Sequence, residues 1–300
     1  MGIRAQTAYN EVCKILQMQN SKCSSSNSHP TKQCVYMNDI RLKKLSSDFV
    51  YDFMSIPTYS EKEKKAIEFI ANWAKLNNID CERDYMGNVY LTKGSVSDGE
   101  YFPCVTAHLD TVQCSQIPYI ERNQRLDVKT RVNDFNEHEI YCEGFGIGGD
   151  DKAGIVVCLS MFEQFDKLKA AFFVQEEIGC QGSRCMNMSW FSNVGYVIGY
   201  DSPELNRASK SCYGVELFDD TFFHKHLKST VEKWGITNFR HEPYTDVTFI
   251  RNKTGLVCMN FGVGYYNCHG NSEYCVLEHM DQACAMGIDI INHLGNNQYT

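Results

Sequence analysis

Imidazole and carboxylate side chains follow apolar segments of this 300-residue chain, each close to the point where the segment ends. Apolar runs over 101–107, 170–175, 194–200 and 255–261 predict strands. A histidine or an acid follows each run, and an Asp-Asp pair follows a glycine-rich turn over 144–149. Parallel strands end at one edge of a sheet, where ligands bind in open α/β sheets. We therefore expect one site at this edge, built from His108, Asp110, Asp150, Glu176, Glu177, Asp201 and His269.

These residue types suit a site for two divalent metal ions, with zinc as the expected metal. Histidine nitrogens and carboxylate oxygens are zinc ligands. A pair of ions about 3.5–4 Å apart needs a shared carboxylate and further ligands on each side. The set supplies that number of ligands and leaves one glutamate to move protons.

Each feature also has an ordinary structural explanation. His108 alone would more often be a hydrogen-bonded core residue, Asp150-Asp151 would cap a helix, and Glu176-Glu177 would be a solvated strand end. However, charged residues directly after buried strands cost free energy unless they are paired or bound to metal. Their recurrence at one expected edge therefore favours a functional site.

Hydrophobic periodicity predicts the elements that must position this set. We expect a further strand over 88–92 and helices over 152–165, 213–234 and 277–294, the last ended by Gly295. Another helix is expected to begin at Ser60, which forms a capping box with Glu63 ahead of an apolar stripe that ends at Leu76. This alternation predicts an α/β fold: a mostly parallel mixed sheet with helices on both faces.

Residues 1–37 differ in composition from the rest of the chain. The stretch 21–33 is rich in Ser, Asn and Lys, which predicts a flexible link after a short N-terminal helix. We therefore expect an N-terminal extension over 1–37 and a single catalytic domain over 38–300.

The charge balance and the cysteines restrict the functional class. The formal net charge is −8 with no basic stripe, so nucleic acid is not an expected partner. No apolar run is long enough to span a bilayer and no apolar signal core follows Met1, so we expect no membrane association. The 15 cysteines form no paired C-x-x-C motifs, and we expect free thiols in a cytoplasmic protein.

Five ordered motifs resemble those of the co-catalytic zinc exopeptidases, above all the peptidase T-like (tripeptide aminopeptidase) group. Segments 56–60 and 84–94 also look like that group. The resemblance covers about residues 45–295, and the ordered set is specific although any one motif is weak. The motifs are His108-Leu109-Asp110-Thr111, Gly149-Asp150-Asp151-Lys152-Ala153-Gly154, Glu176-Glu177-Ile178-Gly179, Asp201-Ser202-Pro203 and the late His269.

The resemblance implies a site with two zinc ions. Asp150 would bridge them. His108 and Asp201 would complete one metal, and Glu177 and His269 would complete the other.

The resemblance also implies roles for the neighbouring acids. Glu176 would be the general base, which takes a proton from the water between the metals and gives it to the leaving amine. Asp110 would orient His108 and set its tautomer. Asp151 is expected at the start of a helix, where negative charge is favoured.

The chain departs from the group between Asp201 and His269, where those enzymes carry an inserted second domain. This interval is too short for that domain, and we expect one helix, a loop and one strand in it. A monomer is therefore favoured, because that domain helps with dimerisation. Substrate contacts would come from local loops, with Tyr213, Tyr244-Thr245-Asp246, Arg251 and Tyr265-Tyr266 as candidates.

We predict a zinc metallopeptidase of the exopeptidase class that hydrolyses small peptides, as an aminopeptidase or dipeptidase. A related hydrolase of N-acyl amino acids would use the same site chemistry and stays an alternative. A catalytically inactive binding protein on the same fold is a further alternative. Glu176 counts against it, because a structural metal site needs no base.

Overall fold

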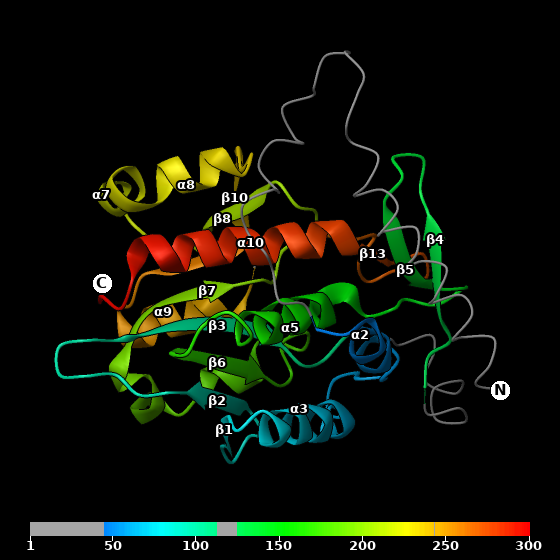
Figure 1. Cartoon of the computed structure of the whole chain (residues 1–300), viewed down its shortest axis with the longest axis horizontal. Coiled ribbons are helices and arrows are strands. Elements are labelled where there is room, and N and C mark those ends of the chain that lie inside the picture. The colour runs from blue at the N-terminus through cyan, green and yellow to red at the C-terminus, as the bar shows by residue number, and fades with distance from the viewer. Residues whose placement is uncertain (1–44, 113–124, 243) are drawn as a thin grey trace, which may run out of the picture. The chain divides into compact units, whose positions relative to one another are not determined.

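The computed structural model describes residues 45–112, 125–242 and 244–300 (Figure 1). The predicted N-terminal extension, with its boundary at residue 38, lies outside the described residues. None of the described helices is both long and apolar enough to cross a bilayer.

A nine-stranded mixed sheet forms the centre of the fold, in the order β1-β2-β6-β3-β7-β11-β8-β10, with β9 paired to β8. The central strands β6, β3, β7 and β11 are parallel, whereas β2 and β8 join them as antiparallel neighbours. The predicted α/β class with a mainly parallel central sheet is confirmed. The strands are β1 Asp80–Arg83, β2 Val89–Lys93, β3 Phe102–His108, β6 Leu168–Phe173, β7 Val194–Gly199, β8 Arg207–Cys212, β9 Val215–Glu216, β10 Asn238–Glu242 and β11 Cys258–Phe261.

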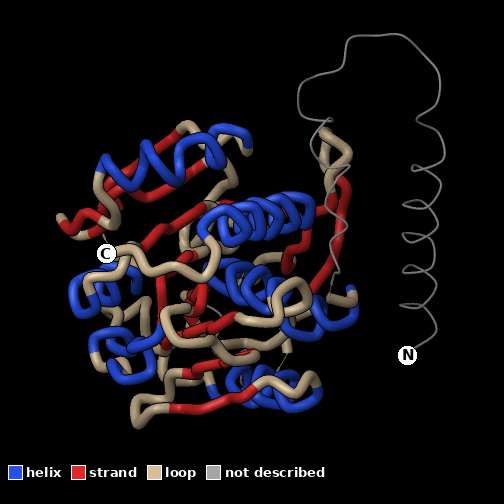
Figure 2. The backbone as a smooth tube through the Cα atoms, turned by 60° about the vertical axis from the view of Figure 1, so that its left-hand side comes forward, coloured by secondary structure: helices blue, strands red, loops and turns tan. Residues whose placement is uncertain are grey.

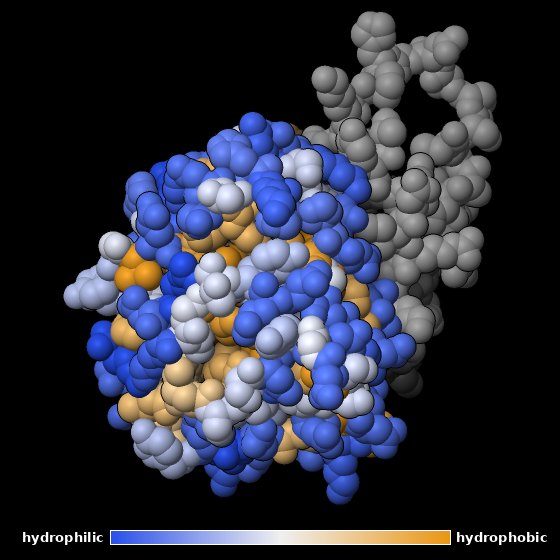
Figure 3. All heavy atoms as spheres, turned by 90° about the vertical axis from the view of Figure 1, so that its left-hand side faces the viewer, coloured by the Kyte–Doolittle hydropathy of each residue, from blue (hydrophilic) through white to orange (hydrophobic). Residues whose placement is uncertain are grey.

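Helices cover both faces of this sheet, with the strands running between them (Figure 2). α5 (Gly149–Met161) and α10 (Leu277–Leu294) pack together on one face, and α9 (Asp246–Thr254) packs on the other against β11. Every residue of β3, β6 and β7 is buried, as expected for apolar strands covered on both sides. Polar residues cover most of the surface on the side where loop 94–101 projects, and apolar side chains show between them (Figure 3).

The remaining helices complete the main layer. Two of them are irregular: η3 is a 3-10 helix and η4 is a π-helix. The bounds are α2 Ser47–Met54, α3 Lys64–Leu76, α6 Gln181–Arg184, η3 Met188–Asn193, α7 Asp220–Phe222, η4 Phe223–Leu227 and α8 Lys228–Lys233.

A second sheet of four strands, which the sequence did not predict, lies beside the amino end of α10. It pairs in the order β12-β13-β5-β4. Tyr266 stacks on Tyr274 across β12 and β13, and the Arg131 guanidinium lies over the Tyr141 and Tyr274 rings. The loop 267–273 between β12 and β13 carries His269. The strands are β4 Val128–Val132, β5 His138–Cys142, β12 Tyr265–Tyr266 and β13 Tyr274–Val276.

The interval between Asp201 and His269 contains more strands and helices than predicted. The expected helix over 213–234 is wrong in its first part, because Gly214, with φ +74°, turns the chain from β8 into β9. Helical structure starts only at Asp220. β8, β9 and β10 extend the main sheet, so the described part of this interval belongs to the sheet and is not a separate domain.

The capping box predicted at Ser60 is also wrong. α3 begins at Lys64, and the Ser60 hydroxyl donates to Asp110 Oδ2 at 2.6 Å. Glu63 Oε1 accepts from the Glu61 and Gln175 amides instead. The apolar stripe of α3 is buried as predicted except at its end, where Leu76 is 83% exposed.

Candidate metal centre

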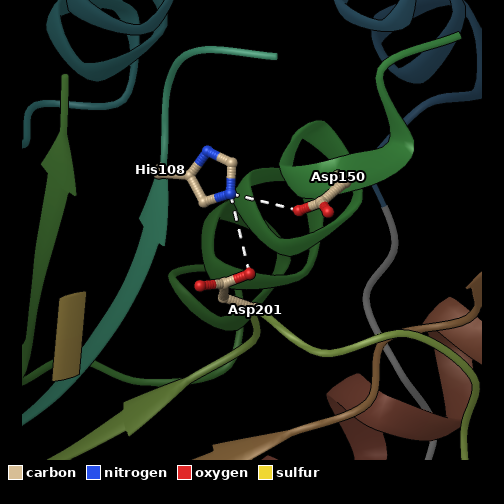
Figure 4. Close-up of side chains that lie close together, drawn as sticks. All are labelled: His108, Asp150 and Asp201. Carbon is tan, nitrogen blue, oxygen red and sulfur yellow. Dashed lines mark hydrogen bonds and ion pairs between the residues drawn. The ribbon is translucent and has the colours of Figure 1, made fainter. Parts of the chain in front are cut away.

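The two histidines of the predicted site face one carboxylate, that of Asp150, from two sides. His108 Nε2 lies 3.1 Å from Asp150 Oδ1, and His269 Nε2 lies 3.3 Å from Asp150 Oδ2. On the outer side of each histidine is a second acid. His108 Nε2 lies 3.6 Å from Asp201 Oδ1 (Figure 4), and His269 Nε2 lies 3.1 Å from Glu177 Oε1.

The five predicted ligands thus gather into two groups that share Asp150. One comprises His108, Asp150 and Asp201, and the other Asp150, Glu177 and His269, with the donor atoms of each within 4.8 Å of one another. Around a tetrahedral ion with bonds near 2.1 Å, neighbouring ligand atoms lie about 3.4 Å apart. Distances of 3.1 to 3.6 Å therefore fit one ion in each group.

Strand ends position the first group. His108 is the last residue of β3, and Asp201 follows β7. The Asn260 side chain, from β11, accepts from the Asp201 amide at 3.0 Å and donates to the Asp201 carbonyl at 2.7 Å. A buried asparagine thus fixes the backbone at Asp201, although its apolar surroundings in the sequence gave no sign of this role.

Glu273 holds the turn that carries Asp150. Its side chain is buried, and its two carboxylate oxygens accept from the Gly148 amide at 2.6 Å and the Asp150 amide at 3.0 Å. Gly148 takes φ +69°, and an added Cβ there would meet the Thr111 side chain at 2.7 Å. Sequence reasoning missed Glu273, because it precedes a short strand, β13, and does not follow a long apolar run.

Asp110 has a different set of partners from the one predicted. His108 Nδ1 is 2.9 Å from the Asp110 backbone carbonyl but 3.7 Å from its carboxylate. The carboxylate accepts from the Glu176 amide at 2.8 Å and the Glu177 amide at 3.1 Å. Its hydrogen bonds therefore orient the Glu176-Glu177 segment, while its backbone oxygen is the one that contacts the imidazole.

Asp151 lies where the sequence predicted, at the start of a helix. Its Oδ1 accepts from the Gly154 amide at 3.1 Å, and its Oδ2 accepts from the His108 amide at 3.2 Å. It is fully buried, and burial raises the pKa of its carboxyl well above the usual range.

Negative charge accumulates around the two imidazoles. Burial, together with the neighbouring carboxylates of Asp201, Asp246 and Glu177, raises the pKa of Glu176 to about 9. Hydrogen bonds to Asp150 and Glu177 raise the pKa of His269 to about 10. Buried carboxylates at this density cost free energy unless cations lie among them, and bound divalent ions are the strongest local charges available.

Glu176 itself lies beside both groups without belonging to either. Its Oε1 lies 3.2 Å from the Cys180 thiol, which donates to it. This arrangement keeps one carboxyl of the cluster outside the two ligand groups.

The predicted substrate-contact residues divide by exposure. Tyr213 and Tyr244 stack with ring centroids 4.9 Å apart, and both are exposed. Asp246 is buried. Arg251 is used locally, donating to the Glu216 and Gly255 carbonyls, and Tyr265 is buried.

Solved peptidase structures share this architecture. The aminopeptidase PepT of Bacillus cereus superposes with a TM-score of 0.65 at 13% identity, over 82% of this chain and 97% of that chain. A tripeptidase of Staphylococcus aureus matches with a TM-score of 0.61 at 14% identity, over 81% and 96% of the two chains. The chain has the peptidase T-like fold. The predicted resemblance to this exopeptidase group is confirmed, at the level of fold.

Two further comparisons extend this resemblance. The Pyrococcus horikoshii TET1 peptidase, which can assemble into a tetrahedron or a large octahedral shell, matches with a TM-score of 0.61 at 15% identity, over 81% of this chain and 98% of that chain. The cytosol non-specific dipeptidase of Escherichia coli is 26% identical over 185 residues. That match covers 58% of this chain, which spans only 37% of the length of the curated relative. No family model matches the sequence.

Proposed function

We propose that this protein is a metal-dependent exopeptidase that hydrolyses small peptides, of the aminopeptidase or dipeptidase type. The observation that carries the proposal is the carboxylate of Asp150, whose two oxygens face His108 and His269 separately. A carboxylate placed in this way is suited to bridge two metal ions.

The residues divide between two ions, for which zinc fits the nitrogen and oxygen donors. His108 and Asp201 would hold one ion, Glu177 and His269 the other, and Asp150 both. When bound, such ions lower the pKa of water and polarise the scissile carbonyl.

Glu176 is the proposed general base. It takes a proton from the attacking water as the water oxygen forms its bond to the scissile carbonyl carbon. It then gives that proton to the amide nitrogen, which leaves as an amine when the carbon–nitrogen bond breaks. Two hydrogen bonds hold Glu176 in place for both transfers: the Cys180 thiol donates to its carboxylate, and its backbone amide donates to the Asp110 carboxylate.

The names of the related proteins support small peptides as the substrate class. They are a tripeptidase, an aminopeptidase and a dipeptidase. The cytosolic dipeptidase also supports the predicted cytoplasmic location. The predicted monomer needs a direct test by light scattering, because the TET1 peptidase forms shells.

Metal analysis and peptide hydrolysis together test the proposal. Wild type should hold about two metal ions per chain and release amino acids from unblocked peptides. His269→Ala should lose metal and activity, whereas His224→Ala, at an exposed histidine of η4, should lose neither. Hydrolysis of N-acylated substrates in preference to unblocked peptides would favour the amidohydrolase. Absence of both metal and hydrolysis would leave a binding protein.

A further inference from the structure

Asp246 is a buried acid that lacks a hydrogen-bond partner. Asp246 is only 3% exposed. Neither of its carboxylate oxygens has a partner in hydrogen-bonding geometry among the described residues. Burial raises the pKa of Asp246 to about 8, and the nearby Ser183 hydroxyl, which lowers it, donates to the Cys180 carbonyl. A buried carboxylate in this state costs free energy, and such groups in native proteins commonly serve a ligand.

The helix that carries this carboxylate packs close to the segment of the proposed base. Asp246 is close enough to Glu176 and Cys180 for its charge to act on both groups. Asp246 is in the first turn of α9, a helix of nine residues that packs against α6. The segment Glu176-Glu177 ends four residues before α6, so the packing of α9 on α6 brings the Asp246 helix near this segment.

The chain is exposed shortly before Asp246. Tyr244, two residues earlier, is 47% exposed and stacks on Tyr213, which is 60% exposed. The segment therefore runs from two exposed, stacked tyrosines to a buried carboxylate without a hydrogen-bond partner.

We infer that Asp246 binds the α-ammonium group of the peptide substrate. This inference rests on the proposed function and narrows it to peptides with a free amino terminus. An ammonium group offers three donors and a positive charge, which would satisfy both unpaired oxygens. The first-turn position stabilises the negative charge of Asp246 but gives its oxygens no direct partner.

Binding of the α-ammonium group by Asp246 would separate the two hydrolase classes that share this site chemistry. An N-acyl substrate has no ammonium group, so it would leave the buried carboxylate unpaired. A site built to bind a polar group rejects analogues that lack it far more strongly than an apolar pocket rejects a smaller substrate. Asp246 therefore makes the site an aminopeptidase site.

Trialanine and propionyl-Ala-Ala test the inference in wild type. The two compounds differ only in the α-amine, which propionyl-Ala-Ala lacks. The expected kcat/KM for trialanine is at least about 100-fold higher. Equal values in wild type would overturn the inference without any variant, and they would leave the proposed peptidase intact.

Asp246→Asn isolates the residue. It should lower kcat/KM for trialanine about 100-fold and leave the value for propionyl-Ala-Ala within about threefold. Asp48→Asn, at an exposed acid in the first turn of α2, should change neither. A parallel loss on both substrates would show that Asp246 is only structural. If Asp246→Asn does not fold, Asp246→Glu, which keeps the charge, should retain the preference for trialanine.

Binding of alaninamide and propionamide by calorimetry gives a readout that needs no hydrolysis. Wild type should bind alaninamide and not propionamide, and Asp246→Asn should bind neither. Failure of wild type to bind alaninamide would overturn the inference that Asp246 binds an α-ammonium group. If wild type hydrolyses no peptide but still binds alaninamide through Asp246, the proposed function is wrong, while Asp246 is still the residue that binds the ammonium group.

Discussion

Glu273 is the support on which the placement of Asp150 depends most, and its removal should have a large effect. Glu273→Ala leaves the Gly148 and Asp150 amides buried without acceptors. An unsatisfied buried donor costs about 1–3 kcal/mol, so two cost about 4 kcal/mol of unfolding free energy. For a chain of this length, about 2–4 °C of Tm is lost per kcal/mol, which predicts a Tm lower by about 8–16 °C. Freed from Glu273, the Asp150 turn should also bind metal about 10–100-fold more weakly.

Thermal melting of the metal-free protein and metal titration against a chelating dye measure the two effects. Glu68→Ala is the matched control, because its exposed pair with Lys64 at 3.7 Å contributes less than about 0.5 kcal/mol. If Glu273→Ala melts within about 2 °C of wild type and binds metal equally well, Glu273 does not hold the turn. A loss of stability with unchanged metal affinity would limit Glu273 to the fold.

Three further predictions concern the proton acceptor, a buried lysine and the metal. Glu176→Gln should lower kcat by about 10²–10⁴-fold with unchanged metal content. The control Glu82→Gln, on exposed β1, should leave kcat unchanged. An unchanged kcat in Glu176→Gln would exclude Glu176 as the base. Burial lowers the pKa of Lys152 to about 8, so the unfolded chain binds more protons between pH 8 and 10.5. Unfolding free energy in urea should therefore rise with pH over that window relative to Lys152→Met, and a flat or falling difference would contradict this. If the free metal concentration is about 1,000-fold above its Kd, removal of the metal by a chelator should lower Tm by about 8–16 °C. Added zinc should restore the Tm. A Tm unaffected by chelator would argue against bound metal.

The central strands could be predicted because their sequence pattern is strong. Buried parallel strands appear as continuous apolar runs, and the polar residue after each run marks its end, as at His108 and Asp201. β8 and the edge strand β10 are rich in polar residues, so periodicity could not identify them. The four-stranded sheet was missed because its strands come from two distant parts of the chain.

The supporting residues of the site were harder to predict than the candidate metal ligands. The ligand candidates other than Asp150 share a position after strands, and Asp150 follows a glycine-rich turn; a sequence displays both features. Ser60 was expected to cap a helix from its local pattern, but its partner Asp110 lies 50 positions away. Glu273 and Asn260 likewise act through contacts that span 123 and 59 positions. No local pattern signals a contact of this range.

Anomalous diffraction at the zinc edge from zinc-loaded crystals tests the central claim most directly. The account predicts two peaks, about 3.5–4 Å apart, one on each side of the Asp150 carboxylate. One peak should lie near His108 and Asp201, and the other near Glu177 and His269. A single peak, or peaks away from Asp150, would contradict the two-metal site on which the proposed function depends.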